Sequence, residues 1–196
     1  MGSNPTGGSI EWYNNTGDDI MNKLIKVLFT TFTILALTAG TSVTTPDWQL
    51  PIKKETPGVL NPDVSQANIK DNICKSGWTD TVRPPVSYTN KLKAQQLAGP
   101  YASFVKIWGT DPAGYEEDHL ISLQLGGSPT DPKNLFPQPY AGKNARTKDV
   151  VETKLKRLVC AGTITLKVAQ KAISTDWAKA YQKYVVNGDT ADGSSN

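Results

Sequence analysis

The stretch YEEDHLISLQLGG, residues 115–127, decides the fold of this chain together with NLFP at residues 134–137. From Leu120 onward the first stretch alternates apolar and polar side chains, which is typical of a strand, so we expect a strand over residues 115–125. The adjacent Leu120 and Ile121 break the alternation and indicate a kink or a bulge. NLFP predicts a second, very short strand that its proline ends. The two stretches therefore predict a pair of short strands joined by a loop.

The segment after the second strand has the pattern of an amphipathic helix over residues 144–160. Its apolar side chains recur at i, i+4, i+7 and i+8 and would form one buried face: Val151, Leu155, Leu158 and Val159. Four further helices are expected, at residues 61–69, 88–97, 166–173 and 177–185. Residues 77–85 are rich in turn formers instead. The sequence therefore predicts an α+β fold that is mainly helical and rich in loops.

The composition suits a globular protein with long loops. Apolar residues make up 38% of the chain and charged residues 20%, and there are 13 prolines and 16 glycines. The formal net charge of +3 permits a polyanionic partner without requiring one. Two cysteines and one histidine exclude a thiolate-rich structural zinc site.

Residues 21–42 have the organisation of a secretory signal peptide. A short segment with two lysines precedes an apolar run at residues 27–37, and small residues follow at 38–42. The run is shorter than the about 20 residues that span a bilayer, although a buried helix or a membrane anchor remains the alternative. Residues 1–20 are either a disordered leader or lie before the true start at Met21. We therefore expect a secreted or periplasmic bacterial protein without stable membrane insertion after signal cleavage.

After the signal peptide, the expected parts of the chain are an extended lead-in at 43–60, one domain at 61–186 with its core at 115–160, and a disordered tail at 187–196. In an oxidising compartment Cys74 and Cys160 are expected to form a disulfide, which would contribute ~3–5 kcal/mol by closing a long loop. Two buried free thiols are the alternative.

His119 is the only histidine in the chain, and it directly follows the carboxylates Glu116, Glu117 and Asp118. Hydrolysis of a phosphodiester needs a base near neutral pH and positive charge at the phosphate. A histidine with a pKa near 6.5 can serve as the base. Oxygen ligands such as Asp and Asn suit a hard divalent cation. These residue types therefore favour metal-assisted hydrolysis.

The same residues resemble the HNH (His-Me finger, ββα-metal) endonuclease motif. Asp118-His119, the Gly126-Gly127 turn, Asn134-Leu135 and Asn144 with Lys148 follow the order of that motif. Asn134 stands 15 residues after His119, and Asn144 another 10 residues on. The resemblance covers about residues 115–152, and the wider exported segment is similar to small secreted bacterial proteins with such a core. It implies a small ββα-metal finger, two short antiparallel strands plus a helix, within a single domain.

The resemblance also implies roles for individual residues. His119 would be the general base, Asn134 would hold the loop that orients it, and Lys148 would contact the phosphate or stabilise the transition state. The implied cation ligands are Asp118 and Asn144, with Glu117 or Glu116 adding a further one. Arg146, Lys148 and Lys143 would bind the nucleic-acid backbone. The implied cofactor is one divalent cation, Mg²⁺ or Mn²⁺ rather than Zn²⁺. Asn144 in place of histidine and the lack of a Cys-x-x-Cys pair depart from the commonest pattern.

The expected function is a monomeric, secreted or periplasmic metal-dependent endonuclease that cleaves DNA or RNA with low sequence specificity. Whether an inhibitor protein restrains it cannot be read from the sequence. One alternative is a non-catalytic exported domain on an HNH-like scaffold that binds nucleic acid or a protein. Another is a hydrolase of cell-wall material with Glu116 or Glu117 as its acid. The basic residues of the helix at 144–160 would also fit a solvent-exposed helix face that has no binding role.

Overall fold

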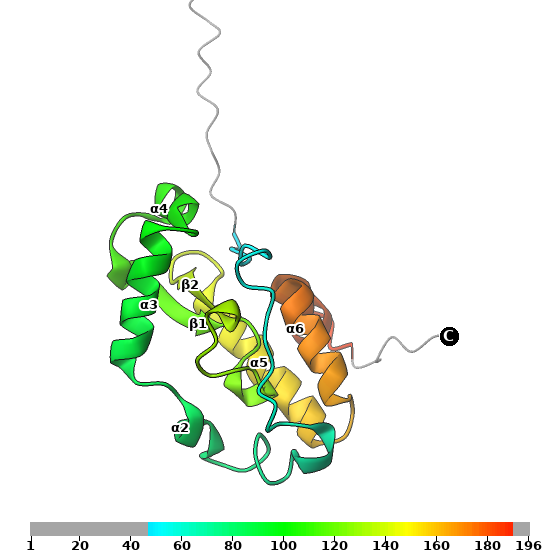
Figure 1. Cartoon of the computed structure of the whole chain (residues 1–196). Helices are drawn as coiled ribbons and strands as arrows, with labels where there is room; N and C mark the ends of the chain where they lie inside the picture. The colour runs from blue at the N-terminus through cyan, green and yellow to red at the C-terminus, as the bar shows by residue number, and fades with distance from the viewer. Residues whose placement is uncertain (1–46, 190–196) are drawn as a thin grey trace, which may run out of the picture. The chain divides into compact units, whose positions relative to one another are not determined.

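The structure is a computed structural model that describes residues 47–189 (Figure 1). The expected leader, signal peptide and most of the tail lie outside the described residues. The helices are α2 (Trp78–Val82), α3 (Val86–Ala98), α4 (Ala102–Trp108), α5 (Ala145–Cys160) and α6 (Leu166–Tyr181), and the strands are β1 (Tyr115–His119) and β2 (Leu135–Pro139). Helices and a small sheet occur together, which confirms the α+β class.

The two strands pair antiparallel, with Glu117 opposite Pro137 and His119 opposite Leu135. β1 is shorter than we expected, because the chain leaves the sheet after His119 and Leu123–Leu125 form a 3-10 turn. β2 is longer than expected and includes two prolines. A sheet of two strands has only edge strands, and a proline is tolerated there because its missing N–H can face away from the partner.

The segment from Ala145 to Cys160 forms the amphipathic helix that its apolar spacing predicts, and its four expected core residues are buried. Helix α6 is capped by Thr165, whose side chain accepts a hydrogen bond from the Val168 N–H at 3.2 Å. We expected two helices in this region. They are joined into one element that is interrupted at Asp176 (φ −163°, ψ 95°), and a π-helical turn follows at Gln182–Val186.

Three expectations for the first half of the described chain were wrong or incomplete. The helix expected at 61–69 is reduced to a 3-10 turn at Gln66–Asn68. There the Asn61 side chain accepts from the Asp63 N–H at 3.0 Å, which holds a local turn in place of a helix cap. Helix α2 lies in the segment that we expected to be all turns, and α4 was not expected.

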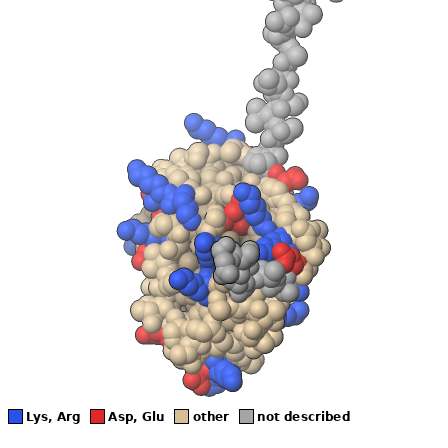
Figure 2. Space-filling view, turned by 90° about the vertical axis from the view of Figure 1, so that its right-hand side faces the viewer, with Lys and Arg blue, Asp and Glu red and all other residues tan. Residues whose placement is uncertain are grey.

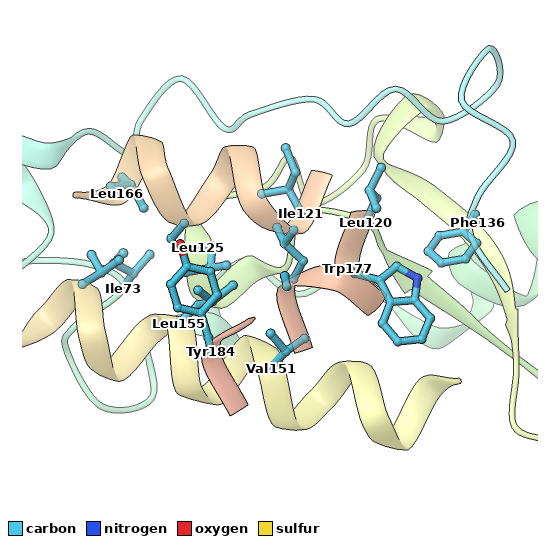
Figure 3. Close-up of a cluster of buried hydrophobic side chains, with 14 of the residues drawn as sticks. Ile73, Leu120, Ile121, Leu125, Phe136, Val151, Leu155, Leu166, Trp177 and Tyr184 are labelled. Atoms are coloured by element: carbon cyan, nitrogen blue, oxygen red, sulfur yellow. The ribbon is translucent and has the colours of Figure 1, made fainter. Parts of the chain in front are cut away.

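The hydrophobic core lies where α5, α6 and the segment after β1 meet (Figure 3). Trp177 is fully buried and packs edge-on against Trp48 of the lead-in, with the ring centroids 5.8 Å apart. Cys74 and Cys160 form the expected disulfide, with their Cα atoms 5.6 Å apart. Within residues 47–189, no helix has the length and apolar character needed to cross a bilayer.

Candidate functional site

His119 ends β1 and is held at three points. Its ring Nε2 lies 2.9 Å from the Pro129 carbonyl oxygen in the loop between the strands. Its backbone N–H donates to Asp118 Oδ1 at 2.8 Å, and its carbonyl oxygen accepts from Lys148 Nζ at 2.6 Å. Only 5% of the residue is exposed. The position of the imidazole is therefore fixed by both its ring and its main chain.

The contact with Pro129 assigns the tautomer of His119. A carbonyl oxygen can only accept, so Nε2 carries the proton and Nδ1 keeps the lone pair. Nδ1 forms no hydrogen bond within the described part of the chain. Burial lowers the pKa of His119, as do the positive charges of Lys148 and Arg83, whereas the Pro129 contact and Asp118 oppose this. The neutral imidazole with Nδ1 unprotonated is therefore the form present at neutral pH.

Asn134 holds the loop that carries Pro129. Its Oδ1 accepts from the Ile121 N–H at 3.0 Å, and its Nδ2 donates to the carbonyls of Ile121 at 3.0 Å and Ser128 at 2.9 Å. The side chain is fully buried. One amide thus satisfies three backbone groups in two parts of the loop, which is the geometry expected of a residue that orients His119.

Gly127 lets the loop pass close to β1. A Cβ added at Gly127 would lie 1.7 Å from the carbonyl oxygen of Ile121 and 2.7 Å from Asn134 Nδ2. Neither atom can move away, because both belong to the hydrogen bonds that Asn134 makes. The preceding Gly126 has φ +72°, a region that favours glycine. The Gly-Gly pair is therefore required by space and by backbone conformation at this turn.

Lys148 is fully buried, and its ammonium group is surrounded by oxygen atoms. Nζ donates to Asp118 Oδ2 at 2.7 Å, to the His119 carbonyl at 2.6 Å and to Glu152 Oε1. Burial disfavours the charge, but Asp118 and Glu152 outweigh it and raise the pKa of Lys148 above its ordinary range. Burial also raises the pKa of Glu152, against the pull of Lys148. Lys148 is therefore a permanent cation in the protein interior.

This placement corrects one expectation. A protonated lysine has three N–H donors, and all three of Lys148 are used inside the protein. None remains for a phosphate, and no part of the side chain reaches solvent. Lys148 is thus not placed as a phosphate contact, because Asp118 and Glu152 draw it inward.

The residues expected to bind a divalent cation already have partners within the protein. Both oxygens of Asp118 are engaged, by the His119 N–H and by Lys148. Asn144 is buried, its Oδ1 accepts from the Gln49 N–H at 2.5 Å, and its Nδ2 donates to the Ala141 carbonyl at 2.6 Å. Among the described residues, no group of three or more His, Cys, Asp and Glu residues could hold a metal ion.

Glu117 is separated from Asp118 because neighbouring strand residues point to opposite faces. Both of its carboxylate oxygens are buried and lack a hydrogen-bond partner among residues 47–189. Burial, helped by the charge of Asp118, raises the pKa of Glu117 to about 8. Glu117 is therefore an enclosed and mainly neutral acid at neutral pH.

Electrostatics also oppose a divalent ion beside Asp118. Two unit charges 4 Å apart interact by about 4 kcal/mol at an effective dielectric constant of 20, so Lys148 at that distance would repel a divalent ion by about 8 kcal/mol and offset a similar attraction by Asp118. Lys148 already supplies the positive charge that Asp118 would share with a metal. With the Lys148 ammonium in place, the donor set of this site therefore does not fit a bound divalent cation.

The other basic residues that we expected to bind nucleic acid are exposed. Arg146 lies 3.8 Å from Asp149 and stacks over Tyr140, with 5.4 Å from its guanidinium carbon to the ring centroid. Lys143 lies 3.3 Å from Asp47 and over the Trp48 ring. Exposed ion pairs of this kind are weak and can exchange for a phosphate.

Arg83 belongs to the same region, although no sequence pattern pointed to it. Burial has the largest effect on both pKa values: it lowers that of His119 and raises that of Asp149. The positive charge of Arg83 lowers both pKa values. Arg83 is exposed and forms no ion pair among the described residues. It follows α2, 36 residues before His119, so only the tertiary fold brings it near the histidine.

Helix α5 also lines a hollow of 460 Å³. Its walls combine charged, polar and apolar side chains: Asp149, Val150, Thr153, Lys154, Arg157 and Val185. The arrangement as a whole combines a neutral imidazole, a buried ammonium and exposed arginines on a strand, turn, strand and helix. Comparison with protein-family models, with curated proteins and with solved structures finds no match to this chain.

Proposed function

We propose that this protein is an exported phosphodiester hydrolase that cleaves DNA or RNA internally with little sequence preference. The observation that carries the proposal is the state of His119. A neutral imidazole with its Nδ1 lone pair unused is fixed at the end of a strand by Pro129, Asp118 and Lys148. A base with these properties can take a proton from water near neutral pH.

The proposed reaction follows from that geometry. Nδ1 removes a proton from a water molecule as the water oxygen attacks phosphorus and the bond from phosphorus to the sugar oxygen breaks. The sugar oxygen leaves as an alkoxide and takes a proton from solvent water, and the imidazolium then returns its proton to solvent. The imidazolium that forms is stabilised by Asp118, whose negative charge raises the pKa of His119. The Nε2–H bond to Pro129 keeps the ring in place while Nδ1 is protonated.

Exposed arginines are the candidates for phosphate contacts. Arg83 acts electrostatically on His119, and Arg146 on the neighbouring Asp149. An arginine can form two parallel hydrogen bonds to a phosphate, which positions the backbone without reading bases. This supports low sequence specificity.

The wider surface also supports a polyanionic substrate. Lysine and arginine side chains are spread over the face that α6 presents (Figure 2). Lys167, Lys171, Lys179 and Lys183 line a hollow of 630 Å³ there. Such charges provide affinity that does not depend on sequence and that falls with salt.

Export remains part of the proposal. A Cys74–Cys160 disulfide is compatible with an oxidising compartment, where such bonds persist. A divalent cofactor, Mg²⁺ or Mn²⁺, was expected from the motif. Because the residues present do not fit such an ion, no step of the proposed reaction passes through it.

A plasmid-nicking assay on the full oxidised chain tests the proposal. Each reaction contains Mg²⁺, Mn²⁺, Zn²⁺ or EDTA, and the wild type is compared with His119→Ala. The matched control is Thr130→Ala, an exposed position next to Pro129 in the same loop. We expect nicking by the wild type and the control, and its loss in His119→Ala with an unchanged circular dichroism spectrum.

A second candidate is a non-catalytic exported binding domain. It is favoured by the ion pair between Asp118 and Lys148, because neither side chain is then free to contact a substrate. If the folded wild type cleaves nothing under any of these conditions but retards a DNA fragment in a gel, this candidate replaces the hydrolase. Activity that persists in His119→Ala would reject the assignment of the base.

A further inference from the structure

The ammonium group of Lys148 sits in a complete cage of oxygen atoms. Asp118 Oδ2 at 2.7 Å and the His119 carbonyl at 2.6 Å come from β1, and Glu152 Oε1 comes from the next turn of α5. The side chain of Lys148 is 0% exposed and that of Glu152 is 7% exposed, whereas that of Asp118 is 16% exposed. The cage is therefore built by the fold and is not a surface contact.

The chemistry of this cage is that of a cation site. Two carboxylate oxygens and a backbone carbonyl are the ligands that hard cations such as Mg²⁺ and Mn²⁺ prefer. Here three N–H groups meet three oxygens, so the cage and the ammonium satisfy each other fully. The second oxygen of Asp118 is already bound to the His119 N–H.

We propose that the Lys148 ammonium is the resident cation of this site and occupies the place that a divalent ion would need beside Asp118. The hydrolytic part of this proposal rests on the proposed function, whereas the occupancy of the cage does not. The site would then be a metal-independent variant of a metal-dependent arrangement, with its positive charge supplied by the chain.

The same contacts make Lys148 a positioning residue for His119. Lys148 fixes the carbonyl of His119 directly, and it fixes the N–H through Asp118, whose other oxygen accepts from Lys148. The main chain of the base is thus clamped on both sides. A divalent ion is not needed to hold this geometry.

Direct titration with Mn²⁺ tests the occupancy. The free Mn²⁺ signal in electron paramagnetic resonance is followed as full-length, oxidised protein is added. We compare the wild type, Asp118→Asn, Lys148→Ala and Lys148→Ala combined with Asp118→Asn. Lys156→Ala, on the same helix, is the matched control for loss of one lysine.

In the wild type and in Lys156→Ala, we expect no Mn²⁺ binding that depends on Asp118. Lys148→Ala leaves the cage oxygens without a cation, so it should bind one Mn²⁺ per chain, and adding Asp118→Asn should weaken this by roughly tenfold or more. Mn²⁺ binding by the wild type that Asp118→Asn removes would overturn the proposal. So would a folded Lys148→Ala variant that binds none.

Two further outcomes are separable. If Lys148→Ala does not fold by circular dichroism, the wild-type and Asp118→Asn titrations decide alone. Nicking by the wild type that continues in EDTA supports the proposal, and nicking that EDTA abolishes and Mg²⁺ restores contradicts it. Absence of nicking under all conditions rejects the proposed function, while the Mn²⁺ titration still decides the occupancy.

Discussion

At the scale of single residues, Asn134 shows how one side chain can organise a site that it does not touch. It bonds to the backbone of Ile121 on one side of the loop and of Ser128 on the other. Its own carbonyl accepts from the Leu120 N–H at 2.7 Å. Pro129, the ring partner of His119, directly follows Ser128. The orientation of the imidazole therefore depends on an amide elsewhere in the loop.

Asn134→Ala should destabilise the protein and reduce nicking. The change leaves one N–H and two carbonyls without partners at a buried position, and each unsatisfied group costs about 1–3 kcal/mol. Because water can relieve part of this, we expect a loss of about 2–4 kcal/mol in the free energy of unfolding. Urea unfolding measures it, with Asn90→Ala on the exposed face of α3 as the control. Equal midpoints for the two variants would contradict the argument.

The sequence indicated some of these residues and misjudged others for a physical reason. The resemblance to the HNH motif pointed to His119 and Asn134, which lie in one strand, loop and strand segment whose length and glycines are visible in the sequence. The burial of Lys148 depends on Asp118 and Glu152, which reach it from two elements. Arg83 comes from a third element. Contacts that form only when separate elements pack together leave no characteristic residue spacing in the sequence.

At the scale of elements, β1 separates two carboxylates that are adjacent in the sequence. Asp118 faces α5 and pairs with Lys148. Glu117 points to the other face of the strand, where burial and the charge of Asp118 raise its pKa and the positive charge of Lys93 on α3 opposes this. Asp118 therefore has a cation beside it, whereas burial of Glu117 disfavours its charge.

This asymmetry predicts that Glu117 makes stability depend on pH. Its pKa is about 8 in the folded protein and 4.5 ordinarily, so the folded state keeps a proton that the unfolded state releases. Stability should therefore fall as the pH rises from about 4.5 to about 8, by about 1.4 kcal/mol for each unit of pKa difference. Glu117→Gln removes the ionisable group and should flatten this part of the dependence.

Urea unfolding of the wild type and Glu117→Gln at pH 5, 7 and 9 measures the effect. The variant should gain stability over the wild type at pH 9 and not at pH 5. Asp71→Asn, an exposed change of the same charge, should shift stability equally at all three values. A wild type and a Glu117→Gln variant that change in parallel with pH would show that Glu117 is ionised in the folded state.

The elements themselves were predictable where one strong local pattern decides them. The apolar spacing from Val151 to Val159 predicted α5 because it marks a single buried face. The expected length of β1 was too great because the alternation of apolar and polar residues continues past His119. In the structure the side chain of Asn134 hydrogen-bonds to the N–H and the carbonyl of Ile121, so the strand does not continue there. Helix α2 lacks an apolar repeat, and it was missed for that reason.

At the scale of the whole molecule, the disulfide links regions that are far apart in the sequence. Cys74 precedes α2, and Cys160 is the last residue of α5, at a sequence separation of 86. The neighbouring Ile73 is fully buried in the core. The bond thus ties the segment that leads to Arg83 to the far end of the helix that carries Lys148. The disulfide therefore restrains the site although neither cysteine belongs to it.

Cys74→Ser combined with Cys160→Ser should lower the free energy of unfolding by about 4–5 kcal/mol, because the unfolded chain regains the freedom of a loop this long. Urea unfolding of the oxidised wild type and the double variant measures the difference. Dithiothreitol should bring the wild type down to the level of the variant and leave the variant unchanged. A reduced wild type as stable as the oxidised one would mean that packing around Ile73 alone holds the two regions together. The expected loss is comparable to the whole stability of many small domains, so activity should then depend on an oxidising environment.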